Sequence, residues 1–289
     1  MTCHPGGSLG ENQAAPDGPD RRVGPDGHRT DRPDIGDSAQ HAHRPDTAPA
    51  ACGRRPIRAI AAIVPAHNEQ DLLPDCLTAL KRAADHPDIL VLGIPVLVLV
   101  VADHCTDRTA AVAHRNGARV ALTEARNVGI ARSVGAARAV EILERGGYRD
   151  DETWLAYTDA DTLVPPDWFA RHLAHAAEGW SAVLGTVQVN DWSLRPPGTA
   201  AIFERCESRV PEDERVHGAN LGVRADVYRR AGGFPALAGG EDHALAASLR
   251  RLGFRVKPAR DMTVTTSARV SHRVAGGFSD HLTRLKTEA

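Results

Sequence analysis

The chain lacks the cysteine pattern of a disulfide-stabilised or zinc-binding protein. Its 289 residues include only five cysteines, which are odd in number, scattered, and form no C-x-x-C pair. The H-E-x-x-H signature is also absent, and we expect His172 and His175 to lie on the polar side of one helix. These absences argue against a redox centre or a histidine zinc site, and they fit a reducing cytoplasm.

The chain also lacks long apolar runs, and its formal net charge is only −2. The longest apolar run, residues 89–102, is shorter than the roughly 20 residues that a membrane helix needs, and Pro95 interrupts it. The N-terminus has no apolar core of the signal-peptide type. Because 35 basic residues face 37 acidic ones, the chain has no general attraction for nucleic acid or an anionic membrane. The sequence therefore predicts a cytoplasmic protein without a transmembrane segment or a nucleic-acid partner.

Residues 1–55 differ in composition from the rest of the chain. They contain no Phe, Trp or Tyr, and their large aliphatic side chains are only Leu9, Val23 and Ile35. Such a segment cannot bury enough apolar surface to offset its ordering entropy. Repeated Pro-Asp-Gly and Arg-Pro-Asp triplets also mark it as low in complexity. We expect residues 1–55 to be disordered and residues 56–289 to form a single domain.

From residue 57 onward, apolar strands alternate with amphipathic helices, which is typical of an α/β sheet with helices on both faces. Polar and acidic residues gather where successive strands end, and ligands of open α/β sheets bind there. An irregular stretch is expected before residue 214, and Leu245, Leu249 and Leu252 are expected on one face of the last helix. The predicted strands are 58–64, 96–102, 118–122, 154–157, 182–189, 254–257 and 262–266, and the longer predicted helices are 128–143 and 167–177.

Asp159 and Asp161 follow the central apolar strand and are separated by one residue. Side chains of a strand alternate with period two, so both carboxylates should leave its end on the same side. Two carboxylates in one small volume repel each other unless a cation lies between them or one keeps its proton. The pattern therefore favours a hard divalent cation with oxygen ligands. The alternative is that both aspartates only turn the chain and cap the helix that begins after Pro165.

Further motifs occur in a fixed order along the chain. Val64-Pro65-Ala66-His67-Asn68-Glu69 follows the first strand, Asp103 and Asp107 follow the second, and Arg126-Asn127-Val128-Gly129 precedes the long helix. Gly218-Ala219-Asn220 and Glu241-Asp242 come after the paired aspartates. In this order the motifs resemble those of the family 2 glycosyltransferases of the GT-A fold, over nearly all of the chain from residue 57. One departure is Cys105, which stands where a serine is usual in the D-x-S-x-D element.

The resemblance implies a mainly parallel GT-A sheet, with a nucleotide-binding half at 56–161 and an acceptor-binding half at 162–289. It implies one inverting transfer of a sugar from a UDP- or GDP-type donor to an acceptor hydroxyl, assisted by Mn²⁺ or Mg²⁺. Asp242 would be the base, with Glu241 in support. Asp159 and Asp161 would hold the metal, with His272 or His281 as its third ligand. Arg273 would contact the phosphates. Arg126 and Arg132 either face the phosphates or carry solvated charge. The other implied contacts are Pro65, Asn68, Glu69, Asp103, Asp107, Asn127 and Asp159 for the nucleotide sugar and Gly218, Ala219 and Asn220 for the acceptor.

Four alternatives to a single glycosyl transfer have less support. The chain lacks the Q-x-x-R-W motif and membrane helices of processive synthases, which favours one transfer to a small or lipid-headgroup acceptor and leaves room for peripheral membrane contact. Residues 159–163 also fit the D-x-D-x-T motif of haloacid-dehalogenase phosphohydrolases, but that motif normally ends the first strand. A nucleotidyltransferase would need a glycine-rich first loop, and a degenerate binding domain would not need the complete acidic set.

Overall fold

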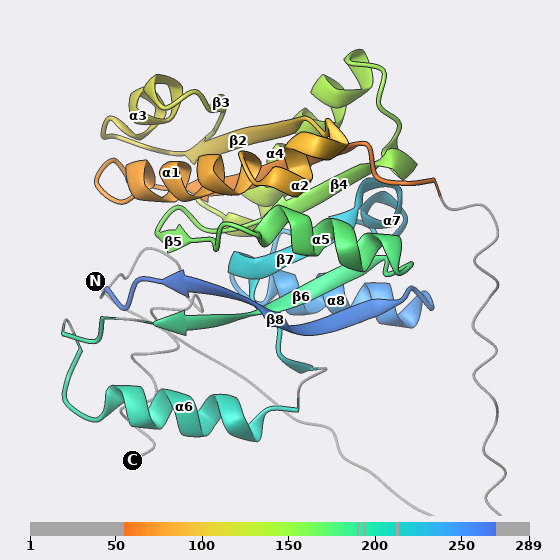
Figure 1. Ribbon diagram of the computed structural model, residues 1–289. Helices are drawn as coiled ribbons and strands as arrows, with labels where there is room; N and C mark the ends of the chain where they lie inside the picture. The colour runs from red at the N-terminus through yellow and green to blue at the C-terminus, as the bar shows by residue number, and fades with distance from the viewer. Residues whose placement is uncertain (1–54, 190, 194, 212–213, 270–289) are drawn as a thin grey trace, which may run out of the picture. The chain divides into compact units, whose positions relative to one another are not determined.

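The computed structural model of the chain describes residues 55–189, 191–193, 195–211 and 214–269 (Figure 1). Within these residues, eight strands form one sheet in the order β3-β2-β1-β4-β7-β6-β8-β5. The strands are β1 (Ala59–Ala66), β2 (Val96–Asp103), β3 (Arg119–Thr123), β4 (Thr153–Tyr157), β5 (Thr162–Leu163), β6 (Ala182–Val189), β7 (Leu221–Arg224) and β8 (Val256–Thr266). The helices are α1 (Leu73–Ala84), α2 (Pro87–Leu92), α3 (Thr109–Arg115), α4 (Val128–Arg145), α5 (Trp168–Ala177), α6 (Thr199–Arg209), α7 (Ala225–Arg230) and α8 (Glu241–Arg251), with short 3₁₀ turns η1 (Asp150–Glu152) and η3 (Gly218–Asn220).

The sheet is mixed, with its parallel half formed by the first four long strands of the chain. β1 pairs in parallel with β2 and β4, and β2 pairs in parallel with β3. β7 is antiparallel to both β4 and β6, while β8 is parallel to β6 and antiparallel to β5. Because parallel strands end at the same edge, the loops that follow β1, β2, β3 and β4 lie side by side. These loops carry the predicted nucleotide and metal residues.

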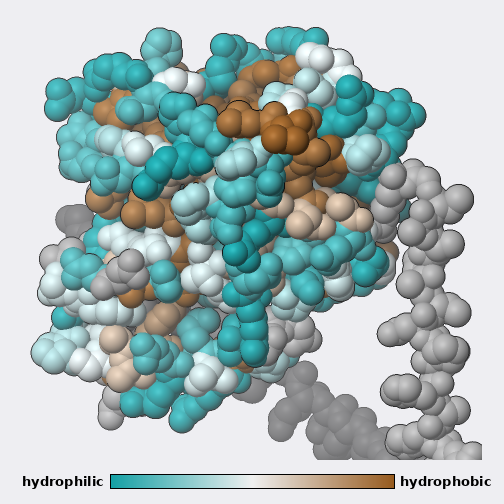
Figure 2. All heavy atoms as spheres, viewed as in Figure 1, coloured by the Kyte–Doolittle hydropathy of each residue, from teal (hydrophilic) through white to brown (hydrophobic). Residues whose placement is uncertain are grey.

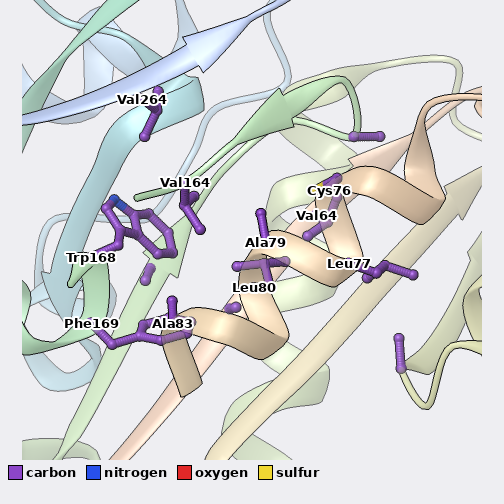
Figure 3. Packing of buried hydrophobic residues seen from close by; sticks show 14 of the residues in the cluster. Val64, Cys76, Leu77, Ala79, Leu80, Ala83, Val164, Trp168, Phe169 and Val264 are labelled. Carbon is purple, nitrogen blue, oxygen red and sulfur yellow. The ribbon is translucent and has the colours of Figure 1, made fainter. Parts of the chain in front are cut away.

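Helices cover both faces of the sheet, as the sequence predicts. Every residue of β1 is buried, and alternate residues join two different hydrophobic clusters. The first cluster includes α1, α3 and α5, and Figure 3 shows Trp168 and Phe169 of α5 lying beside Leu80 and Ala83 of α1. The second cluster includes residues of α4, α7 and α8. The loops at the strand ends are therefore held by a core on each side.

The long helix α4 packs unusually close to the sheet at Gly135. A Cβ atom added there would lie 2.5 Å from Cγ2 of Ile63 and 2.9 Å from Cγ2 of Val101. Only glycine leaves room for this approach, which brings the helix onto β1 and β2. The N-terminal turns of α4 are thereby fixed beside the strand ends.

The structure corrects the prediction for α5. His172 is fully buried and His175 is 7% exposed, so neither lies on a polar helix face. Both continue the buried stripe that begins at Trp168, at helical positions i, i+4 and i+7. The ring of His172 lies 4.8 Å from that of Trp168 and 5.9 Å from that of Trp154, between centroids. Burial lowers the pKa of His172 from its ordinary 6.5 to about 3.

Three further predictions for the second half are wrong in detail. The stretch expected to be irregular contains α6. The two short C-terminal strands are one strand, β8, whose register with β6 shifts between Gly185 and Thr186. Leu252 is 45% exposed, because it follows the last turn of α8 instead of lying on its buried face with Leu245 and Leu249.

An apolar patch lies on the outer surface at α2. Leu90, Val91 and Leu92 are 63%, 86% and 61% exposed, and Figure 2 shows apolar side chains gathered over this helix. None of the helices in the described ranges has both the length and the apolar character that a membrane crossing requires.

Candidate active site

A cavity of about 870 Å³ opens at the carboxyl ends of the parallel strands. It brings together residues from segments that are far apart in the sequence, among them the loops after β1, β2 and β4, the start of α4 and the start of α8. The predicted site residues that line it are Pro65, Asn68, Glu69, Asp103, Arg126, Asn127, Arg132, Asp159, Asp161, Gly218, Ala219, Glu241 and Asp242.

The loops after β1 and β2 are joined through Asn68 and Cys105. Asn68 adopts a left-handed backbone conformation with φ 54°, and its side-chain oxygen accepts a hydrogen bond of 2.8 Å from the backbone N–H of Thr106. The thiol of Cys105 accepts from the N–H of Asn68 at 3.3 Å and donates to the carbonyl oxygen of Ala66 at 3.3 Å. Cys105 does not line the cavity. Its thiol connects the loops that follow β1 and β2, so this departure from serine lies at a contact between two loops.

Asp103 holds the third loop of the site in place. Its two carboxylate oxygens accept hydrogen bonds from the backbone N–H groups of Arg126 and Asn127, at 2.9 and 2.8 Å. Asn127 then caps α4 by accepting from the N–H of Ile130. Since each carboxylate oxygen has a second acceptor position, Asp103 still faces the cavity with hydrogen-bonding capacity.

Asp107 and Asn220, two of the predicted site residues, are not among the residues that line the cavity. Asp107 accepts hydrogen bonds from the N–H and hydroxyl of Thr109 and from the N–H of Gln70, so it binds neighbouring loops together. Asn220 is fully buried: its side-chain oxygen accepts from Trp168, and its amide donates to the carbonyl oxygens of Thr186 and Met262. Both side chains have structural partners for their polar atoms.

The aspartate pair is balanced by two arginines from distant parts of the chain. Asp159 accepts a hydrogen bond of 2.7 Å from Arg132, and Asp161 lies 3.2 Å from Arg269. Arg269 also forms a two-pronged ion pair with Glu69. Burial is the main reason why the pKa of Asp161 is raised to about 6; Arg269 opposes this shift, and the nearby carboxylates of Asp159 and Glu69 add to it. Arg269 has no local sequence motif that would have revealed this role.

Arg132 is buried, which decides against the alternative of a solvated charge. Its side chain is 4% exposed and donates to Asp159 and to Glu241. Burial alone would lower the pKa of Arg132, but the carboxylates of Asp159, Glu241 and Asp242 raise it above its ordinary value. Burial raises the pKa of Glu241 in spite of this partner.

Asp242 has a different environment from Glu241. One of its oxygens accepts a hydrogen bond of 2.7 Å from the backbone N–H of Gly218, and the other accepts from the N–H of His243. No arginine or lysine forms an ion pair with Asp242 within the ranges that the structure describes. Its carboxylate lines the cavity and interacts with the charge of Arg132 without forming an ion pair with it.

The cavity as a whole has an excess of acidic groups. Among the described residues that line it are eight carboxylates and four arginines. Sequence reasoning missed several of these lining residues, namely Arg269 and the segment around α6 that contributes Glu207, Glu214, Arg215 and His217. No group of three or more histidine, cysteine, aspartate or glutamate side chains is placed to hold a metal within the described part of the chain. The candidates His272, Arg273 and His281 lie outside the described residues.

Comparison with known proteins shows the family to which the chain belongs. Residues 61–232, more than half of the chain, match the family described as glycosyl transferase family 2. The chain belongs to this family. By that membership it falls in the glycosyltransferase class, and the phosphohydrolase alternative loses its support. No curated protein matches the chain.

Solved structures show that the fold is the GT-A fold expected from the sequence. A mannosyltransferase from Pyrobaculum calidifontis, in complex with GDP-Man and Mn²⁺, has a TM-score of 0.55 and 22% identity, over 76% of this chain and 59% of that one. TarS from S. aureus, as residues 1–349, has a TM-score of 0.52 and 15% identity, over 73% of this chain and 60% of that one. The same fragment in complex with UDP has a TM-score of 0.50 and 14% identity, over 72% of this chain and 60% of that one. The match thus spans about three fifths of each of these proteins.

Proposed function

We propose that this family 2 member transfers one sugar from a nucleoside-diphosphate sugar to an acceptor hydroxyl, with inversion and with help from a divalent metal. The observation that carries the proposal is the cavity itself, in which the predicted nucleotide loops, the paired aspartates and the Glu241-Asp242 pair meet at one sheet edge. The GT-A neighbours bind GDP-Man with Mn²⁺ in one case and UDP in another, which supports a UDP- or GDP-type donor.

The charge of the cavity supports the proposal of a divalent cation. A donor diphosphate is an anion, and eight carboxylates against four arginines would repel it unless a cation were added. Asp161 is buried next to two other carboxylates, and Mn²⁺ or Mg²⁺ would relieve their mutual repulsion. We propose Asp159 and Asp161 as the residues that hold the metal. When bound, the metal would stabilise the negative charge that the leaving diphosphate develops.

Nucleotide binding is assigned to the loops of the parallel half. Pro65, Asn68 and Glu69 line the cavity after β1, and Asp103 and Asn127 line it beside them. Asp103 is the proposed partner of the base, because it is held in a fixed orientation by two backbone N–H groups. Arg126 faces the cavity from the adjoining loop and is proposed as a phosphate contact.

Asp242 is the proposed catalytic base. An acceptor hydroxyl is a poor nucleophile until a positioned group takes its proton. Glu241 is already paired with Arg132, whereas Asp242 faces the cavity without such a partner and is oriented by Gly218. Attack on C1 opposite the leaving diphosphate inverts the anomeric configuration. The acceptor would lie near Gly218 and Ala219 and is a small molecule or a lipid headgroup, in the cytoplasm.

A thermal-shift panel tests the proposal. UDP, GDP and dTDP sugars are added with and without Mn²⁺, and a ligand at 100 times its dissociation constant stabilises a protein by about 2.7 kcal/mol. We expect one nucleotide class to raise the melting temperature only with metal, and the same class to be turned over with release of nucleoside diphosphate. A panel without any metal-dependent shift would contradict the proposed donor class.

A further inference from the structure

The buried guanidinium of Arg132 connects two parts of the cavity lining that are far apart in the sequence. Arg132 lies in the second turn of α4, and one of its terminal nitrogens donates to Asp159 at 2.7 Å. The other terminal nitrogen donates to Glu241, the first residue of α8, which is 109 positions away in the sequence. One side chain thus joins the proposed metal aspartate to the helix that carries the proposed base.

The packing around this guanidinium is tight on two sides. One turn earlier on α4, a Cβ atom on Gly129 would lie 3.2 Å from the Cβ of Glu241, so the start of α8 rests directly on α4. At Gly218, an added Cβ would lie 2.5 Å from Cζ and from both terminal nitrogens of Arg132. The guanidinium also lies over the ring of Phe234, with its Cζ 5.6 Å from the ring centroid.

Gly218 connects this packing to the proposed base. It presents its Cα to the guanidinium, and its N–H donates to Asp242 at 2.7 Å. We propose that Arg132 is a positioning residue, which sets the place of Asp242 relative to Asp159 through its contacts with Glu241 and Gly218. The proposal rests on the proposed function, because it concerns the same reaction.

A lysine could not replace Arg132 in this role. The planar guanidinium presents several N–H donors in fixed directions, so it can hold two carboxylates at once while its flat face packs against Gly218. The ammonium group of a lysine is a point charge on a flexible stem and has no flat face. Arg132→Lys therefore keeps the buried positive charge but releases the geometric constraint. A misplacement of about 1 Å near reacting groups can cost about 10²-fold in rate.

A kinetic test distinguishes a positioning role of Arg132 from direct contact with the nucleotide sugar. With the donor that the thermal-shift panel identifies, we measure nucleoside diphosphate release by wild type, Arg132→Lys, Gly218→Ala and the double variant. Arg132→Lys should lower kcat by about 10- to 100-fold while the dissociation constant of the nucleoside diphosphate stays within about twofold. The double variant should be no slower than Arg132→Lys, since both changes disturb one contact. Arg138→Lys, an exposed position on the same helix, is the control and should behave as wild type.

Two outcomes would overturn the inference. If Arg132→Lys binds the nucleotide tenfold more weakly and keeps its kcat, Arg132 contacts the sugar donor directly. If the losses in kcat of the two single variants multiply in the double variant, Arg132 and Gly218 act independently. If no donor is found, the proposed function fails, but the contact is still testable by urea unfolding of the same four proteins. Non-additive unfolding free energies then support the Arg132–Gly218 contact, and additive ones refute it.

Discussion

Acid should destabilise this protein through one buried histidine. His172 is fully buried between two tryptophan rings, and among the described residues neither of its ring nitrogens has a hydrogen-bond partner. Burial, with a smaller contribution from the nearby His175, lowers its pKa to about 3. Below pH 6.5 the unfolded chain therefore takes up a proton that the folded chain refuses. The stability contributed by neutral His172 is complete above pH 6.5 and is lost as the pH falls towards 3.

The size of the effect follows from the two pKa values. At pH 4.5 the unfolded histidine is almost fully protonated, while the folded one is almost fully neutral. The linkage relation then gives a loss of roughly 3 kcal/mol between pH 7.5 and 4.5 from this one residue. Asp161 acts in the opposite direction, since its raised pKa of about 6 favours the folded state as acid is added. The contribution of His172 is therefore measured as the difference in unfolding free energy between wild type and a variant that lacks this histidine.

The assay is urea unfolding at a series of pH values for wild type and His172→Phe. The variant cannot titrate at this position, so wild type should lose roughly 3 kcal/mol more than the variant between pH 7.5 and 4.5. Any change in packing that phenylalanine introduces is the same at each pH and cancels from this slope. His114→Phe, at an exposed position on α3, is the control and should follow wild type. Parallel pH curves for wild type and His172→Phe would refute the reasoning.

Two further predictions concern the reaction and the N-terminal segment. Asp242→Asn should lower kcat by about 10²- to 10⁴-fold while the nucleotide still binds, as measured by turnover and calorimetry; an active Asp242→Asn beside an inactive Glu241→Gln would assign the base to the other carboxylate. Deleting residues 1–54, whose composition offers little apolar surface to bury, should leave the melting temperature and turnover almost unchanged, and an unstable or inactive truncation would show that the segment packs on the domain.

The parts of the site that the sequence predicts well depend on local signals. Asp159 and Asp161 follow an apolar strand directly, and Asn68 and Asp103 follow two others, so strand periodicity and parallel order are enough to place them at one edge. The order of the motifs along the chain also predicts Glu241 and Asp242 as site residues, and both lie at the start of a helix as expected.

The remaining features depend on contacts between residues that are far apart in sequence. The ion pairs from Arg132 to Glu241 and from Arg269 to Glu69 join positions 109 and 200 residues apart, and no spacing rule relates them. The period of α5 shows that His172 shares a face with Trp168, but the sequence does not say that this face is the buried one. The burial of Asn220 is also not predictable from the sequence, because it depends on the positions of Thr186 in β6 and Met262 in β8, whose carbonyl oxygens accept its hydrogen bonds.

The metal-dependent binding of a nucleoside diphosphate tests the central claim most directly. In calorimetry, UDP or GDP should bind the wild-type protein with Mn²⁺, and binding should fall when EDTA removes the metal. Asp161→Ala should keep the wild-type circular dichroism spectrum but lose this metal-dependent binding, while Asp85→Ala, at an exposed position on the surface, should retain it. Equal nucleotide affinity of wild type and Asp161→Ala, with or without Mn²⁺, would contradict the account.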